Sequence, residues 1–226
     1  MPTAIITGAS RGLGLALARA LAAEGYRLVI DARHARDLEA AARDLGADVT
    51  AVAGDVADPA HRAALVAAAG PRIDVLVNNA SVLGPSPQPA LADYPLDVLE
   101  RVYRVNILAP LALTQLALPR IPAGGTILNV TSDAAVEPYP GWGGYGSSKA
   151  ALEQLSAVLA AERPELRIHA VDPGDMRTRM HQEAFPGEDI SDRPEPEASV
   201  PGLLALIAGE RGSGRWRAHD VAEARV

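Results

Sequence analysis

The stretch TGASRGLG, residues 7–14, decides how the beginning of this chain folds. It follows a short apolar run at residues 3–7 and opens a helical pattern at residues 13–25. Its three glycines permit a tight turn and the close approach of a ligand, and the helix beyond offers free N–H groups and a positive dipole end. At the first strand-to-helix turn, this pattern predicts binding of a dinucleotide pyrophosphate; a glycine-rich turn without a ligand is the alternative.

The rest of the chain repeats this alternation of apolar runs and helical stretches. We expect further strands at residues 26–31, 47–56, 73–80, 124–132 and 166–174, and a short edge strand at 213–218. We expect further helices at residues 36–46, 57–70, 98–107, 111–119, 147–163 and 198–209. Near-continuous apolar strands that alternate with helices indicate a parallel sheet covered on both faces. With right-handed crossovers, the predicted fold class is α/β, a single Rossmann-type doubly wound domain over residues 1–226.

Composition narrows the class of protein further. A chain of 226 residues can bury one sizeable core, and its net charge of −7 argues against binding of nucleic acid. The chain has no cysteine, which excludes disulfides and thiolate metal sites and favours a reducing, cytoplasmic location. The five histidines are too scattered to predict a metal site. No apolar run reaches the roughly 18 residues of a membrane span, and the N-terminus lacks the features of a signal peptide, so we expect no membrane contact.

Several short motifs occur in an order that is more specific than any one of them. They are TGASRGLG (7–14), GDV (54–56), NNAS (78–81), Asn106, Ser132, Tyr145 with Lys149, and DPGDMRT (172–178). By this ordered set, nearly the whole chain resembles the short-chain dehydrogenase/reductase family, and its tail is similar to the small carbonyl-reductase-like branch. The resemblance implies an NAD(P)-dependent oxidoreductase that moves a hydride between the cofactor and a carbonyl or alcohol. The alternative on the same fold is a non-catalytic protein that senses a dinucleotide.

Tyr145 and Lys149 lie four residues apart and therefore on one face of a helix. Reduction of a carbonyl needs a proton donor, and a tyrosine with its usual pKa of about 10 is a poor one near neutrality. A nearby ammonium lowers that pKa, so we expect Lys149 to tune Tyr145 as general acid and base. The resemblance implies further that Ser132 binds the substrate oxygen, that Lys149 holds the nicotinamide ribose, and that Asn106 holds a water that relays protons. Taken alone, Tyr-x-x-x-Lys would be an ordinary helix face.

The end of the second predicted strand bears on the choice of cofactor. A carboxylate there would bind the ribose 2′-hydroxyl of NAD, whereas basic residues favour the 2′-phosphate of NADP. In the family register this place falls on Ala32, followed by Arg33, and Arg11 lies in the glycine turn, so we expect NADP(H). The alternative is that Asp31 reaches the ribose. The resemblance also implies that Asp55 accepts from the adenine amino group. The full set expected to bind the cofactor is Gly8, Ser10, Arg11, Gly12, Leu13, Gly14, Arg33, Asp55, Val56, Asn79, Ala80, Ser81, Tyr145, Lys149, Pro173, Gly174, Met176 and Thr178.

The expected substrate is a small-molecule carbonyl or alcohol, bound between residues 82–89, 133–142 and 176–196. The polar segment at about residues 176–199 is either a lid over this site or a plain surface loop. His181, in that segment, could touch the substrate, but a surface role is favoured. The residues expected to contact the substrate are Ser132, Trp142, Tyr145 and Met180.

The predicted helix at residues 147–163 is apolar on several faces, more than packing on one side requires. In the family that the chain resembles, this helix and the one at residues 111–119 pair between subunits. The resemblance therefore implies a homodimer or a homotetramer.

Overall fold

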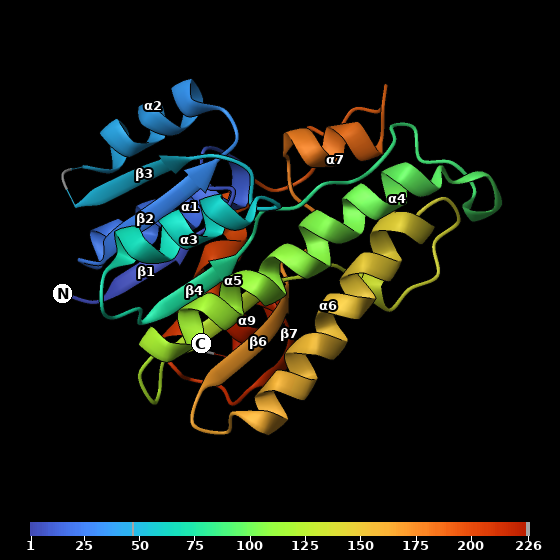
Figure 1. Ribbon diagram of the computed structural model, residues 1–226. Helices are drawn as coiled ribbons and strands as arrows, with labels where there is room; N and C mark the ends of the chain where they lie inside the picture. Colours follow the sequence, from blue (N-terminus) through green and yellow to red (C-terminus); the bar gives the residue numbers. More distant parts are fainter. Residues whose placement is uncertain (47, 225–226) are drawn as a thin grey trace.

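A parallel sheet of seven strands forms the centre of the molecule in the computed structural model, which describes residues 1–46 and 48–224 (Figure 1). The strands lie in the order β3-β2-β1-β4-β5-β6-β7, and every neighbouring pair is parallel. Their bounds are β1 Thr3–Ile6, β2 Arg27–Ala32, β3 Val49–Ala53, β4 Val75–Asn78, β5 Thr126–Val130, β6 Arg167–Asp172 and β7 Gly214–Arg217. The predicted doubly wound α/β fold is confirmed, with the last strand at an edge.

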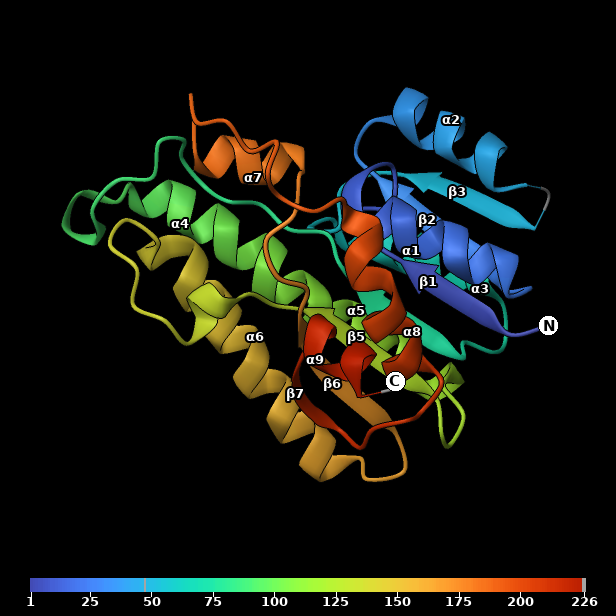
Figure 2. The same cartoon turned by 180° about the vertical axis from the view of Figure 1, so that it is seen from behind.

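Helices cover both faces of the sheet because successive side chains of each strand point to opposite sides. In β1, Ala4 and Ile6 belong to the core on one face, and Ile5 belongs to the core on the other. The first face is covered by α1 (Gly12–Ala23), α2 (Ala35–Leu45), α8 (Val200–Ile207) and α9 (Ala218–Glu223). The second face is covered by α3 (Pro59–Ala69), α5 (Ala109–Ala117) and α6 (Gly143–Glu162). Figures 1 and 2 show these two layers from opposite sides.

The strand order reverses at β1. The chain builds β2 and β3 on one side of β1 and then crosses to β4 on the other side. Such a reversal leaves a crevice beyond the carboxyl ends of the two strands, where ligands of open α/β sheets bind. Thr7 follows β1 and Asn79 follows β4, and the backbone N–H of Asn79 donates to Oγ1 of Thr7 at 3.0 Å. The glycine turn and the NNAS motif therefore meet at this reversal.

α4 (Leu96–Tyr103) and α5 are joined by a π-helical turn over Arg104–Leu108 and are not separate helices. The sequence predicts two helices, at residues 98–107 and 111–119, and Pro110 lies in the gap between them. Pro110 lacks the N–H that an α-helix would place against the carbonyl oxygen of Asn106, so the regular pattern widens there without ending. Single π-helical turns of this kind occur often at functional sites.

α6 begins at Gly143, four residues before the predicted start at residue 147, so Tyr145 lies in its first turn. The glycines at this end argue against a helix if only intrinsic propensity is considered. Packing requires them, because a Cβ on Gly144 would lie 2.3 Å from Cζ of Tyr94. The position of Tyr145 is thus set by a tertiary contact that the local sequence does not display.

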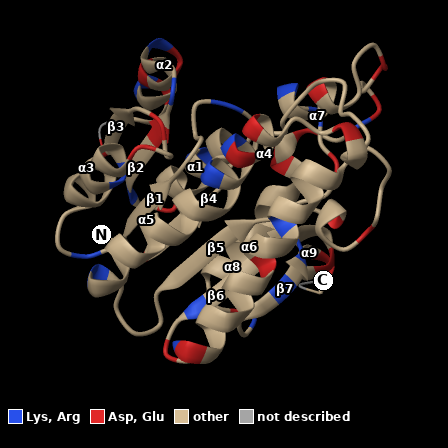
Figure 3. Cartoon of the chain, turned by 45° about the vertical axis from the view of Figure 1, so that its right-hand side comes forward, with Lys and Arg blue, Asp and Glu red and all other residues tan. Residues whose placement is uncertain are grey.

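The remaining segments follow the prediction with shorter elements. Residue 47, where the third strand is predicted to begin, lies outside the described residues, and so do residues 225–226. The segment at residues 176–199 contains α7 (Arg179–Ala184) and ends in a 3-10 turn. Figure 3 shows acidic and basic residues interspersed on α4 and α7. Across residues 1–46 and 48–224, no helix combines the length and the apolar character needed to cross a bilayer.

Candidate active site

A cavity of about 800 Å³ opens beyond the carboxyl ends of the strands. Three of the residues predicted to be catalytic line it, namely Ser132, Tyr145 and Lys149, whereas Asn106 is buried outside the lining. Of the residues predicted to bind the cofactor, all line this cavity except Gly14. The predicted substrate contacts also line it: Ser132, Trp142, Tyr145 and Met180. The fold thus gathers motifs from the whole length of the chain around one space.

The glycine turn leaves room for a pyrophosphate directly against its backbone. Gly8 and Gly12 have φ values of +67° and +56°, which residues with side chains rarely adopt. A Cβ on Gly14 would lie 2.6 Å from the carbonyl oxygen of Gly8, so the turn closes only around glycine. The side chain of Arg11 does not cap α1, so the N–H groups of the first turn have no side-chain partner there and can bind an anion. The residues present fit a bound dinucleotide.

Asp31 is enclosed by the protein, with 1% of its side chain exposed. Oδ1 accepts from the backbone N–H of Gly8 at 2.6 Å, and Oδ2 contacts Nε2 of His61 at 2.9 Å. Oδ1 thus holds the glycine turn and Oδ2 binds His61 of α3, so both oxygens are engaged within the protein. This does not support the alternative that Asp31 binds a ribose hydroxyl. Arg11 and Arg33 lie exposed at the cavity, and neither guanidinium pairs with another side chain in the described part of the chain.

Asp55 and Arg101 form an ion pair in the cavity wall that the motifs do not indicate. Nη2 of Arg101 donates to Oδ2 of Asp55, and Oδ1 accepts from the backbone N–H of Ala57 at 2.9 Å. Burial acts to raise the pKa of Asp55, but these hydrogen bonds outweigh it and the pKa is lowered. The predicted helix at residues 98–107 includes Arg101, but its periodicity alone does not show that this position faces the cavity.

Lys149 is the only lysine of the chain, and its exposed fraction is 2%. Its Nζ donates to the carbonyl oxygen of Val130 at 2.9 Å and lies 5.5 Å from the ring centroid of Tyr145. Burial lowers the pKa of Lys149 to about 8, although the charge of Glu153 acts in the opposite direction. Its ammonium therefore releases a proton near neutrality far more readily than an exposed lysine does.

Tyr145 has a raised pKa, which is opposite in direction to the prediction. Burial is the largest cause. The hydroxyl of Ser81 lowers this pKa, and the carboxylates of Asp172 and Asp133 raise it. Lys149 is hydrogen-bonded elsewhere and approaches the ring, so the chain's own groups favour the protonated phenol. The sequence shows the nearby charge but not the depth of burial, and burial has the larger effect.

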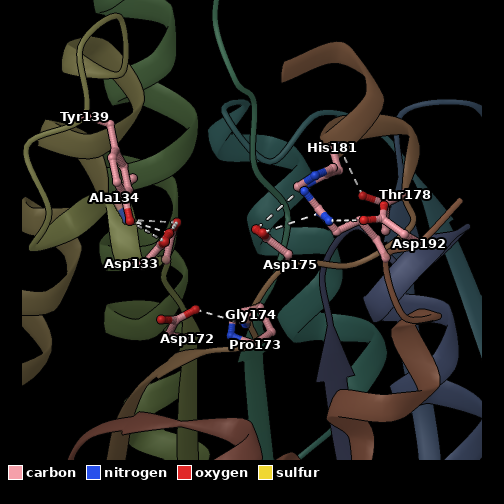
Figure 4. A network of polar contacts seen from close by, with 12 residues as sticks. Asp133, Ala134, Tyr139, Asp172, Pro173, Gly174, Asp175, Thr178, His181 and Asp192 are labelled. Atoms are coloured by element: carbon pink, nitrogen blue, oxygen red, sulfur yellow. Dashed lines mark hydrogen bonds and ion pairs between the residues drawn. The ribbon is translucent and has the colours of Figure 1, made fainter. Parts of the chain in front are cut away.

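Ser132 follows β5, and its hydroxyl is held by two neighbours. Its Oγ donates to Oδ1 of Asp133 at 2.9 Å and accepts from the backbone N–H of Ala134 at 3.2 Å. Oδ2 of Asp133 accepts from the hydroxyl of Tyr139 at 3.0 Å, as Figure 4 shows. The carboxyl group of Asp133 therefore orients the hydroxyl of Ser132, although none of the sequence motifs includes Asp133 as a site residue.

Asn106 lies in the π-helical turn, and its side chain is fully used inside the protein. Oδ1 accepts from the N–H of Val82 at 2.9 Å and from Oγ of Ser81 at 3.1 Å. Nδ2 donates to the carbonyl oxygen of Val82 at 2.9 Å and to Oγ of Ser148 at 3.0 Å. The water of the predicted proton relay would therefore have to bind the backbone of Asn106 and not its side chain.

Apolar side chains form the outer wall of the cavity. The ring centroid of Trp142 lies 5.9 Å from that of Tyr145 and 5.8 Å from that of Phe185. Trp142 and Met180 pack against a core cluster that includes Leu83. This wall suits the apolar part of a small organic molecule.

His181 lies in the cavity, so the surface role favoured from the sequence is wrong. Its side chain is 10% exposed, and Nδ1 lies 3.8 Å from Oδ1 of Asp175, on the side opposite Asp133 in Figure 4. Thr178 caps α7 by accepting from the backbone N–H of His181 at 3.2 Å. α7 has six residues, too few for periodicity to show which of its side chains point inward.

The fold and the cavity together define a class of protein. A glycine turn at the reversal of a parallel sheet, with a Tyr–Lys pair and a serine in the same cavity, is the arrangement of a dinucleotide-dependent enzyme of the doubly wound fold.

Comparison with known proteins gives the family. A family model described as "short chain dehydrogenase" matches residues 2–189. The chain is 35% identical to L-xylo-3-hexulose reductase of Hypocrea jecorina, over 92% of this chain and 76% of that one. It is 34% identical to benzil reductase ((S)-benzoin forming) of Saccharomyces cerevisiae, over 88% of this chain and 79% of that one. A short-chain dehydrogenase of Shigella flexneri, solved in complex with NADP, superposes with a TM-score of 0.89 at 27% identity, over 96% of each chain.

The chain belongs to the short-chain dehydrogenase family. The predicted family and the predicted oxidoreductase function are therefore confirmed. Its cofactor is a nicotinamide dinucleotide, as is general in this family.

Proposed function

We propose that this protein is an NADP(H)-preferring carbonyl reductase or alcohol dehydrogenase. The observation that carries the proposal is the presence of Ser132, Tyr145 and Lys149 in one cavity with the N-terminus of α1, which no side chain caps. The two curated relatives are both named as reductases, and a solved neighbour carries NADP, which support the same activity and cofactor.

The cavity offers a place for each part of the cofactor, which supplies or accepts the hydride when bound. The first-turn N–H groups of α1 hold the pyrophosphate, and Asp55 accepts from the adenine amino group. Arg11 and Arg33 hold the 2′-phosphate; their unpaired guanidiniums at the cavity support this preference. The residues proposed for the nicotinamide end are Asn79, Ala80, Ser81, Tyr145, Lys149, Pro173, Gly174, Met176 and Thr178.

Tyr145 donates the proton to the substrate oxygen, and the hydroxyl of Ser132 stabilises the negative charge that develops there. The raised pKa of Tyr145 keeps the phenol protonated at neutral pH, so the proton is in place for the reductive direction, but it also makes the proton harder to release. As the phenolate forms, the ammonium of Lys149 on the same helix face offsets its charge. Lys149 also holds the nicotinamide ribose, and a water on the backbone of Asn106 returns a proton to it.

Trp142 and Met180 contact the apolar part of the substrate, and the segment at residues 176–199 acts as a lid. Leu108 and Leu116 on the α5 side and Val158 on α6 are large apolar side chains exposed to solvent, which supports a homodimer or homotetramer through these helices. We keep a cytoplasmic location as the prediction, since a chain without cysteine suits a reducing compartment.

The purified protein should oxidise NADPH in the presence of a carbonyl panel. Tyr145→Phe should lose at least about 100-fold in kcat with the cofactor dissociation constant nearly unchanged, because only the proton donor is removed. Tyr26→Phe is the matched control, since Tyr26 lies outside the cavity and keeps its ring packing. Full activity of Tyr145→Phe on a confirmed substrate would contradict the mechanism.

The cofactor preference has its own test. Arg33→Ala should lower kcat/KM for NADPH by about 10- to 100-fold and leave that for NADH within about twofold, because a charged hydrogen bond to the phosphate is lost. Arg36→Ala removes an exposed arginine nearby and serves as the control. Equal losses with both cofactors would show that Arg33 does not recognise the phosphate.

A further inference from the structure

The hydroxyl proton of Ser132 is engaged before any substrate can use it. Oγ of Ser132 donates to Oδ1 of Asp133 at 2.9 Å and accepts from the backbone N–H of Ala134 at 3.2 Å. A serine hydroxyl has a single proton, so it cannot donate to Asp133 and to a substrate carbonyl at once. A substrate oxygen receives this proton only when the bond to Asp133 is given up.

Asp133 needs a replacement donor when that happens. Its Oδ1 also accepts from the N–H of Ala134 at 2.8 Å. Among the described residues, its Oδ2 accepts only from the hydroxyl of Tyr139, at 3.0 Å. Within residues 1–46 and 48–224, no lysine, arginine or histidine forms an ion pair with Asp133. A carboxylate offers about four acceptor positions. Asp133 therefore has capacity for a further donor and loses a good bond if Ser132 turns away.

We propose that Asp133 makes this enzyme selective for ketones that carry a hydrogen-bond donor, first of all a hydroxyl, on the carbon next to the carbonyl. That donor takes the place of Ser132 on the carboxylate and frees the Ser132 proton for the carbonyl oxygen. The two oxygens of a 2-hydroxy ketone lie about one hydrogen-bond length apart, and Oγ of Ser132 and Oδ1 of Asp133 are separated by such a length. This inference rests on the proposed function.

The other walls of the cavity support the same substrate class. Trp142, Met180 and Leu83 line it together with Asp133, so a polar pair of oxygens at one end can be combined with an apolar group at the other. An aryl hydroxy ketone has both parts. 2-Hydroxyacetophenone is therefore a suitable probe, and propiophenone is nearly the same shape without the donor.

The test compares kcat/KM for 2-hydroxyacetophenone, 2-methoxyacetophenone and propiophenone with NADPH. The wild type should prefer the hydroxy ketone by about 10- to 100-fold, the range of one hydrogen bond to a charged acceptor. An oxygen substituent also makes the carbonyl more electrophilic, so the methoxy compound, which cannot donate, measures that effect separately. 2-Aminoacetophenone, with its amino group on the carbon next to the carbonyl, tests an amine donor in place of the hydroxyl. A preference for the amino or for the hydroxy ketone over the methoxy ketone supports the proposal.

The variants Asp133→Asn and Asp133→Ala identify the residue responsible. Asp133→Ala removes the acceptor and should reduce the hydroxy-to-methoxy ratio to within about threefold of unity, while Tyr145 remains to reduce propiophenone. Asp133→Asn keeps an acceptor oxygen but loses the charge, so it should lower the ratio by a smaller factor. Glu137→Gln removes the same charge from an exposed position outside the cavity and should keep the wild-type ratio. Thermal unfolding of each variant checks that it is folded.

The outcomes separate the two proposals. An unchanged ratio in both Asp133 variants, or no preference for a donor in the wild type, overturns the role of Asp133 and leaves the reductase in place. No turnover of any carbonyl by the wild type, with NADPH or NADH, overturns the proposed function, and the substrate class fails with it.

Discussion

Lys149 allows a prediction whose magnitude follows from its surroundings. Burial lowers its pKa from the ordinary 10.5 to about 8. A lowered pKa means that the folded protein binds this proton less tightly than the unfolded chain does, so the buried charge destabilises the fold below about pH 8. This penalty shrinks as the pH rises from about 8 toward 10.5. At about 1.4 kcal/mol for each pH unit of difference, it amounts to about 3 kcal/mol at pH 7 and about 1 kcal/mol at pH 9.5.

Lys149→Met removes the penalty and should raise the free energy of unfolding at pH 7. The substitution also removes the hydrogen bond that the neutral amine makes to the carbonyl oxygen of Val130, a loss of about 1 kcal/mol that does not depend on pH. The variant should therefore be more stable than the wild type by about 2 kcal/mol at pH 7 and nearly equal to it at pH 9.5. The difference of about 2 kcal/mol between the two pH values isolates the buried charge, because the hydrogen-bond loss cancels.

Urea unfolding of both proteins at pH 7 and pH 9.5, without cofactor, measures this difference. Because Lys149 is the only lysine, incorporation of ¹³C-lysine also gives a single side chain to titrate by NMR, with an expected midpoint near pH 8. Arg36→Met is the control, since an arginine remains charged at both pH values and this one is exposed. A stability difference that does not change with pH, or a lysine midpoint near 10.5, would refute the reasoning.

Three further predictions concern the cofactor side of the cavity. Gly14→Ala places a Cβ 2.6 Å from a backbone carbonyl oxygen, so it should lower the free energy of unfolding by about 1–3 kcal/mol and weaken NADPH binding in a fluorescence titration. Gly212→Ala is the control, because a Cβ there meets open space and should change neither quantity. Asp31→Ala leaves a buried N–H and a buried histidine without their partner, so urea unfolding should show a loss of about 3 kcal/mol, and Asp31→Asn should lose less. Arg101→Met should raise the Kd for NADPH several-fold and leave kcat unchanged, because Asp55 then lacks its ion-pair partner. A Kd equal to that of the wild type would show that the ion pair does not contribute to binding of the adenine.

The fold could be predicted because its signals are local. The apolar runs alternate with helical patterns, and the glycine turn fixes the first strand-to-helix connection, so the parallel sheet follows without long-range information. The misplaced boundaries have tertiary causes. Position 144 needs a glycine because Tyr94 packs against it, although glycine disfavours a helix, and the chain continues through Pro110 because a π-helical turn accommodates the missing N–H.

The two polar pairs around the site, Asp31 with His61 and Asp55 with Arg101, could not be predicted from the sequence for a different reason. Asp31 and His61 are 30 positions apart, and their contact depends on how α3 packs against the sheet. Asp55 and Arg101 likewise meet only because α4 presents one side to the cavity. Spacing along the chain predicts contacts within one helix, as for Tyr145, but gives no information on contacts between elements.

For Tyr145 and Lys149, the sequence also fails to predict the direction of a pKa shift, because it does not show how deeply the two side chains are buried. The spacing correctly places an ammonium beside a phenol, and from that alone the pKa of the phenol should fall. Both side chains are buried, and burial disfavours the charged form of each, so the pKa of Tyr145 rises while that of Lys149 falls. Before any reaction, the phenol of Tyr145 is therefore protonated, and the neighbouring Lys149 has a lower pKa than an ordinary lysine. The phenol carries the proton that the substrate needs, and its release is eased by the positive charge of Lys149. The negative charge that develops on the phenolate in turn raises the pKa of Lys149 and keeps that residue protonated. Burial therefore sets the starting protonation of the pair, and the charge of Lys149 matters most once Tyr145 has donated.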